Sequence, residues 1–235
     1  MWETLQLLSF GDGGWGDELL AGFTVTITLA LATLPFGLVM GLLIALAQIS
    51  EEPSLRRAAR IYTTIFRGLP ELLTIFIVFY GGQMALQALV SRFTDEYVEV
   101  NAFAAGMLAL GLVFSAYASE VFLSAFRGIP AGQWEGAAAL GLSRFATFRL
   151  VILPQLIRLS IGGLGNLWLI LTKETSLVSV IALDELLRQT SVAVGVTKQP
   201  ILFYSVACAI YLGLSLVSSR GLVLIERRVN RGEAR

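Results

Sequence analysis

The 235-residue chain is 56% hydrophobic and only 14% charged, and its 17 basic residues balance 17 acidic ones. This composition is not that of an ordinary soluble domain and indicates a membrane-embedded protein. The chain has no histidine, which removes the commonest metal ligand and the commonest general base. Its single cysteine, Cys208, excludes an intrachain disulfide. We therefore expect no catalytic residue, no metal site and no nucleic acid partner.

Apolar runs predict five membrane-spanning helices in one all-α domain that covers residues 1–235. Four charge-free runs have about 20 residues or more, enough at ~1.5 Å per residue to cross a ~30 Å hydrocarbon core. A fifth apolar stretch is weaker because it contains Pro154 and Arg158. Because the membrane interior has no water to bond the backbone N–H and C=O groups, these segments must form helices, in which those groups bond to one another. The predicted spans are approximately 19–49, 62–91, 100–126, 146–172 and 199–227.

The distribution of basic residues predicts the orientation of the chain in the membrane. The N-terminal tail has no Lys or Arg, whereas the loops after spans one and three and the C-terminal tail are rich in Arg. This pattern places the N-terminus outside, in the periplasm, and the C-terminus in the cytoplasm. The acidic residues of the outer segments are Glu3, Asp12, Asp17, Glu18, Asp95, Glu96 and Glu99, and the basic residues of the C-terminal tail are Arg227, Arg228, Arg231 and Arg235.

Residues 173–197 separate the last two spans and are too short in their apolar part to cross the membrane. We expect a re-entrant or short interfacial segment on the outer side. Asp184 is a candidate N-cap for a short helix over 184–189, because a carboxylate there accepts hydrogen bonds from free backbone N–H groups.

The segment Gly132–Pro154, GQWEGAAALGLSRFATFRLVILP, is a polar interruption between two spans on the predicted cytoplasmic side. A short helix over about 131–143 is expected, with Pro130 placed to initiate it and Glu135 in its first turns. Trp134 is a candidate aromatic anchor for a partner protein. The alternative interpretation is an amphipathic connector that lies on the membrane surface.

This segment resembles the EAA signature of bacterial ATP-binding-cassette import permeases, although Gly136 replaces the usual Ala and Val151 the usual Ile. The resemblance implies a cytoplasmic coupling helix that docks onto a separate ATPase dimer, where ATP and Mg²⁺ bind. The chain itself has no glycine-rich phosphate loop, so no cofactor is expected in it. The expected coupling residues are Trp134, Glu135, Gly136, Ala137, Gly141 and Arg144.

Three further segments, Tyr62–Gly82, Tyr117–Gly128 and Leu171–Ile181, are similar to signatures of polar amino acid permeases. The residues within these segments are most similar to those of the Q-type subunits of histidine, arginine/ornithine and opine importers. This resemblance implies a type I importer fold in the bacterial inner membrane, a second permease chain of the M type, and a periplasmic amino-acid-binding protein. A homodimer stays open, as do glutamine as cargo and a channel or transporter that works without ATP.

Several charged residues are candidates for the substrate pathway. Arg67 and Glu71 are four residues apart and are predicted to share a helix face, and Glu71 and Glu120 are both predicted in the cytoplasmic half. Charges at this depth are costly and should face the interior of the bundle. In one interpretation, the carboxylates Glu71 and Glu120 attract a cationic substrate. In the other, Arg67 and Glu71 pair within one helix, Glu120 has a partner of its own, and these contacts only hold the helices in register. The remaining candidates are Tyr117, and Lys173, Glu174 and Thr175 at the outer end of span four.

Overall fold

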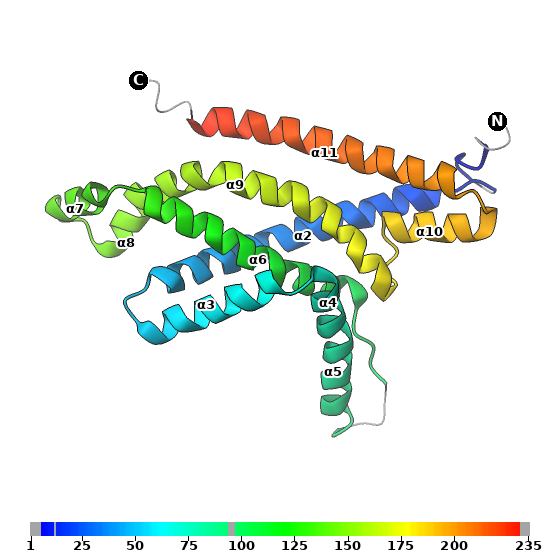
Figure 1. Cartoon of the computed structure of the whole chain (residues 1–235), viewed down its shortest axis with the longest axis horizontal. Coiled ribbons are helices and arrows are strands. Elements are labelled where there is room, and N and C mark those ends of the chain that lie inside the picture. Colours follow the sequence, from blue (N-terminus) through cyan, green and yellow to red (C-terminus); the bar gives the residue numbers. More distant parts are fainter. Residues whose placement is uncertain (1–5, 12, 94–96, 231–235) are drawn as a thin grey trace.

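The computed structural model describes residues 6–11, 13–93 and 97–230, and the regular elements in these ranges are helices (Figure 1). Six residues used for the predicted orientation lie outside the described ranges: Glu3, Asp12, Asp95, Glu96, Arg231 and Arg235. The elements are α2 (Gly16–Ile49), α3 (Pro53–Gly68), α4 (Glu71–Phe76), the π-helix η1 (Ile77–Gly81), α5 (Gly82–Val90), α6 (Ala102–Gly128), α7 (Ala131–Ala139), α8 (Arg144–Thr147), the π-helix η2 (Phe148–Ile152), α9 (Leu153–Glu174), the 3₁₀ helix η3 (Thr175–Ile181), α10 (Leu186–Thr197) and α11 (Pro200–Asn230).

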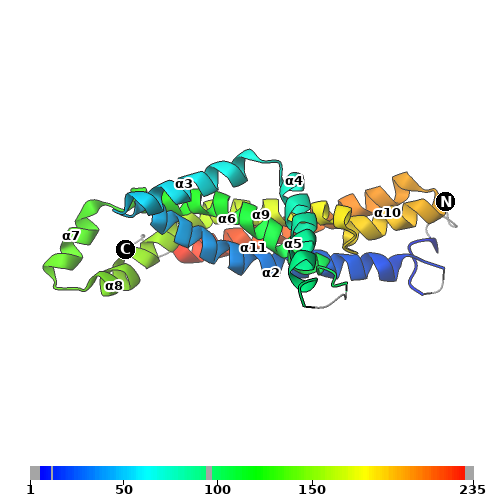
Figure 2. The ribbon, with the colours of Figure 1, turned by 90° about the horizontal axis from the view of Figure 1, so that it is seen from below.

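Five helical stretches are long and apolar enough to cross a membrane, as predicted: Gly16–Ile49, Glu71–Val90, Ala102–Gly128, Arg144–Ile181 and Pro200–Val229. The helices α2, α6, α9 and α11 follow the long axis of the molecule (Figures 1 and 2). Helix α2 begins at one end of this axis, and α11 finishes toward the other end, where α7 and α8 lie.

The region of the predicted second span, 62–91, differs from a single straight helix. Helix α3 lies along α2 and ends at Gly68, and the chain then turns so that α4, η1 and α5 project away from the bundle (Figure 1). The turn is at Leu69-Pro70, where Leu69 has extended backbone angles (φ −93°, ψ 142°). The proline ring clashes with the backbone of the preceding residue when that residue is helical, so the helical conformation is disfavoured at Leu69 and α3 ends here.

The main core lies where α2 packs against α6. Gly41 allows this approach, because a Cβ atom there would lie 2.8 Å from the Ala118 Cβ and 3.1 Å from the backbone oxygen of Ser115. Gly37 likewise lies directly against the Phe114 ring. Small residues at such contacts let helix backbones come close together in membranes. The close packing fixes the position of α6, which carries Tyr117, Glu120 and Ser124 of the site described below.

A π-helical turn, η2, comes immediately before Pro154 in the fourth span. Proline has no N–H to donate to the carbonyl one turn earlier, and widening of the helix relieves the resulting clash. The fourth span is therefore distorted next to Pro154.

A second, smaller core joins α10 to the beginnings of α2 and α11, through Leu19, Leu186, Ala193 and Phe203. The residue that caps α10 is Glu185, not Asp184 as the sequence predicted, and the helix continues to Thr197.

The buried carboxylate of Glu185 accepts hydrogen bonds from the backbone N–H groups of Leu187 (2.9 Å) and Arg188 (2.6 Å) and from the Tyr211 hydroxyl (3.1 Å). Because these donors satisfy it, the carboxylate is able to sit inside the protein while Asp184 stays exposed.

Candidate coupling helix and transport pathway

Helix α7 projects at one end of the long axis, away from the bundle (Figure 1). Of its nine residues, only Ala137 is buried, and the others are exposed. One side-chain contact ties the helix to the fourth span, where the Gln155 amide donates to the Gln133 side chain at 3.2 Å. A short helix so little covered by its own chain has a surface available for a partner.

Gly141 ends this helix in a specific way. Its φ of +73° lies in the left-handed region, which residues other than glycine rarely adopt. The Gly141 N–H donates to the Ala138 carbonyl (2.9 Å) and the Leu142 N–H to the Ala137 carbonyl (3.1 Å). These two bonds form a Schellman motif, which satisfies the last carbonyls of the helix and reverses the chain. The glycine of the predicted motif therefore has a structural reason to be glycine.

The apolar surface at this end of the molecule is larger than the sequence predicted. Trp134 is 40% exposed, as a candidate anchor requires, but Leu140 (82%) and Phe145 (73%) are more exposed. Glu135 is exposed and lies in the second turn of α7. Arg144 is exposed at the start of α8.

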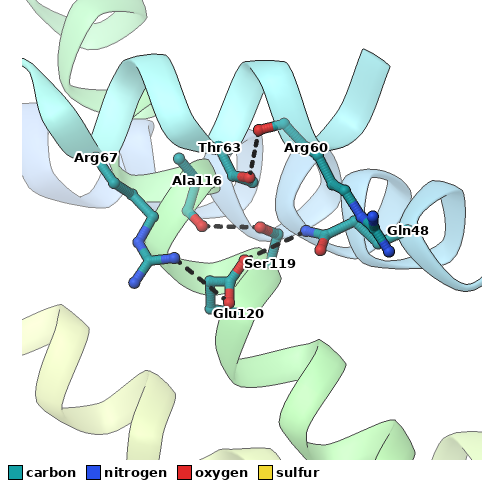
Figure 3. Close-up of polar contacts among 7 residues, drawn as sticks. All are labelled: Gln48, Arg60, Thr63, Arg67, Ala116, Ser119 and Glu120. Atoms are coloured by element: carbon teal, nitrogen blue, oxygen red, sulfur yellow. Dashed lines mark hydrogen bonds and ion pairs between the residues drawn. The ribbon is translucent and has the colours of Figure 1, made fainter. Parts of the chain in front are cut away.

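A polar cluster joins three helices in the middle of the bundle (Figure 3). The Arg67 guanidinium of α3 pairs with the Glu120 carboxylate of α6 at 3.4 Å, and the Gln48 amide of α2 donates to the same carboxylate at 3.4 Å. Arg67 also lies 5.8 Å from the centre of the Tyr117 ring. The predicted pairing of Arg67 with Glu71 is not formed, because the break at Leu69-Pro70 places the two residues on different helices.

Glu71 lies instead at the same cavity as Glu174 of α9. Both line a cavity of about 190 Å³ between α4, α6 and α9. Glu71 was predicted in the cytoplasmic half and Glu174 at the outer end of span four, but the structure puts them at the same level. The remaining lining residues are Phe114, Tyr117, Leu167 and Ile170.

One turn further along α6, a larger groove of about 480 Å³ opens between α6 and α9. Glu120 and Ser124 line it on α6, and Leu159 and Gly163 on α9. Because Tyr117 borders the first cavity and Glu120 the second, the two hollows follow one another along the same face of α6.

Two of the predicted pathway residues lie away from these hollows. Lys173 is exposed, and Thr175 is buried with its hydroxyl donating to the Thr172 carbonyl at 2.9 Å. Of the three residues predicted at the end of span four, Glu174 alone lines the cavity.

The model of one protein family, described as the inner membrane component of binding-protein-dependent transport systems, matches residues 34–231. The chain belongs to this family. Among its relatives, the nopaline transport system permease protein NocQ of Agrobacterium fabrum is 42% identical over 97% of this chain and 98% of the relative. The arginine ABC transporter permease protein ArtQ of Haemophilus influenzae is 38% identical, over 89% of this chain and 92% of the relative.

A crystal structure of an amino acid ABC transporter with histidines contains a chain with the same fold as this permease. The TM-score is 0.78 at 31% sequence identity, and the match covers 91% of this chain and 95% of the other. The resemblance to Q-type permeases of amino acid and opine importers, predicted from the motifs, is thereby confirmed. The chain is a multi-pass membrane permease subunit.

The sequence did not identify three permease residues that belong to these sites. Gln48 was overlooked because a single amide in an apolar span carries no motif, although its place just before the end of the first span was a signal. Phe145 and Leu140 were overlooked because exposed apolar residues are common in membrane proteins, and only the structure shows how exposed they are, in α8 and directly after α7.

Proposed function

We propose that this permease forms part of the pathway of an ATP-driven importer for cationic amino acids or opines. The observation that carries the proposal is the pair of carboxyl groups, Glu71 and Glu174, in one small cavity beside Tyr117. Two carboxylates that line one small cavity repel each other, and a guanidinium or ammonium group between them relieves the repulsion. The Tyr117 ring offers a further favourable surface for a cation.

The neighbouring cluster supplies the opposite charge. Arg67 lies over the same Tyr117 ring and is half-exposed, so it is able to meet the carboxylate of an amino acid whose side chain lies near Glu71. Opines such as those named for the relatives combine such cationic and anionic groups. The relatives' names, which include nopaline and arginine, support the same substrate class.

Helix α7 is the proposed coupling helix to a separate ATPase subunit dimer. Three observations support this role: the exposure of α7, the exposed apolar residues Trp134, Leu140 and Phe145 in and after it, and its place at the end of the molecule toward which α11 runs. We infer that this end of the molecule faces the cytoplasm of a bacterium, in its inner membrane, and that the start of α2 faces the periplasm. A second permease chain of the M type and a periplasmic binding protein complete the proposed complex.

A movement of α7 that the ATPase causes would be transmitted to the pathway through the fourth span. Helix α7 is followed by α8 and η2, which lead directly into α9, and α9 carries both Glu174 and the wall of the larger groove. A rigid-body shift of α9 against α6 would therefore change both hollows together.

The cargo proposal is tested with Glu71→Gln and Glu174→Gln, singly and together, in the complex reconstituted with its ATPase. Loss of charged hydrogen bonds costs about 1.5–3 kcal/mol, so the KM for arginine uptake should rise about tenfold or more. Glu99→Gln is the matched control, because Glu99 is exposed in the loop before α6. Unchanged arginine uptake in the double variant would refute the role of the pair.

The coupling proposal is tested with Glu135→Ala in the co-expressed complex. We expect the permease to insert normally but to retain less ATPase on affinity purification. Glu51→Ala is the control, because Glu51 is also exposed, just beyond the end of α2. Equal ATPase retention and equal transport in both variants would exclude Glu135 from the docking surface.

A further inference from the structure

A group of arginines at the start of α3 has no role in the proposed pathway. Arg56, Arg57 and Arg60, together with Pro53, line a concavity of about 310 Å³ on the surface. In the described part of the chain none of these three guanidinium groups pairs with a carboxylate, in contrast to Arg67 further along the same helix. Three unpaired cations around one hollow are an unusual arrangement, because like charges repel unless an anion joins them.

The hollow lies at the edge of the membrane-spanning region. Helix α2 ends at Ile49 and α3 begins at Pro53, so the arginines fall within about 10 Å of the start of α3 along its axis. Because the candidate membrane span Gly16–Ile49 ends just before α3, we infer that this level is near the boundary between hydrocarbon and lipid headgroups. Glu51 and Glu52 are close in sequence, but neither forms an ion pair with these arginines.

Apolar residues on the outer surface of α3 accompany the basic hollow. Leu55 is 51% exposed, Ile61 54% and Ile65 47%. A helix that combines an exposed apolar face with a row of arginines is suited to the membrane interface, where acyl chains cover the first and headgroup phosphates meet the second. A soluble anion would leave these three aliphatic side chains uncovered.

We propose that Arg56, Arg57 and Arg60 bind the phosphodiester headgroup of an anionic phospholipid, with an acyl chain along the exposed apolar face of α3. Arginine has a planar fork of donors that matches phosphate oxygens, and basic hollows beside membrane helices on one leaflet are typical headgroup sites. Bound there, the lipid would hold the turn between α2 and α3 at a fixed depth, and this turn leads to Gln48 on one side and to Arg67 on the other.

The test is native mass spectrometry of the purified complex with its ATPase, titrated with phosphatidylglycerol and with phosphatidylcholine. Each arginine near an anionic headgroup contributes about fivefold in affinity, equivalent to about 1 kcal/mol. We therefore expect the Arg56→Gln, Arg57→Gln, Arg60→Gln triple variant to bind phosphatidylglycerol at least tenfold more weakly, with phosphatidylcholine binding unchanged. Arg227→Gln with Arg228→Gln, at the exposed end of α11, is the control and should bind as the unmodified complex does.

Three results would overturn the proposal. The first is phosphatidylglycerol binding by the triple variant equal to that of the unmodified complex. The second is loss of the ATPase subunit from the triple variant while phosphatidylglycerol binding persists, which would assign the hollow to a protein partner, and the third is competition by glycerol phosphate at the same concentration as the lipid, which would assign it to a soluble anion. Should the triple variant not assemble, Arg57→Gln alone tests the same site, because Arg57 is exposed, and a fivefold loss of affinity is expected.

Discussion

Replacement of Gly41 by alanine tests the packing that positions the pathway. The added Cβ would lie 2.8 Å from the Ala118 Cβ, 3.1 Å from the Ser115 carbonyl oxygen and 3.2 Å from the Ser119 nitrogen. Carbon atoms prefer separations of about 3.5–4.0 Å, and two of these neighbours are backbone atoms that cannot turn away, so α2 must withdraw from α6 by about 1 Å. Overpacking of this kind costs about 1–3 kcal/mol.

The matched control is Gly213→Ala in α11, where a Cβ would meet nothing within 4 Å. Both substitutions gain the same helix propensity, about 1 kcal/mol, so the difference between the two variants isolates the contact. At about 2–4 °C per kcal/mol for a chain of this size, Gly41→Ala should melt about 2–12 °C below Gly213→Ala.

The assay is thermal unfolding of the purified complex, followed by the loss of its size-exclusion peak. Gln48 lies two turns beyond Gly41 on the same face of α2, so withdrawal of the helix should also lengthen the 3.4 Å contact between Gln48 and Glu120. Equal melting temperatures for the two alanine variants would refute the close packing of α2 and α6.

Three further predictions concern the polar groups. A double-mutant cycle of Arg67→Gln and Glu120→Gln, read by thermal unfolding, should give a coupling below about 1 kcal/mol, because the side chains are 43% and 35% exposed; a coupling several times larger would show that the pair is shielded from water. Tyr211→Phe removes a donor to the buried Glu185 and should cost about 1–3 kcal/mol, whereas Tyr204→Phe, at an exposed ring, should change stability little. Burial raises the pKa of Glu185 above its ordinary value of 4.5, so the folded chain keeps this proton to higher pH than the unfolded chain. The unfolding free energy should therefore fall as pH rises from 4.5, and Glu185→Gln should remove this part of the slope in denaturant titrations; an identical slope in the variant would contradict it.

The features that the sequence predicted are those set by local physics. Five apolar stretches had to become helices, because the membrane offers no water to their backbone groups. Gly141 was singled out as part of a motif, and the structure gives it a positive φ at the end of α7.

The features that were missed depend on which helices meet. Arg67 and Glu71 are close in sequence, but the extended Leu69 between them separates their helices. Arg67 pairs with Glu120 of α6, and Glu71 lines a cavity with Glu174 of α9. Composition makes Glu71–Val90 a candidate span, whereas its direction relative to the bundle depends on the turn at Pro70 and cannot be inferred from hydropathy.

The most direct test of the central claim is substrate-stimulated ATPase activity of the complete importer. The permease would be purified with its ATPase and partner permease chain in nanodiscs, and its binding protein would be loaded with arginine, histidine, ornithine, an opine or glutamine. The account predicts stimulation by the cationic compounds or opines, and loss of that stimulation in the Glu71→Gln, Glu174→Gln double variant. Stimulation by glutamine alone, unchanged in the double variant, would contradict it.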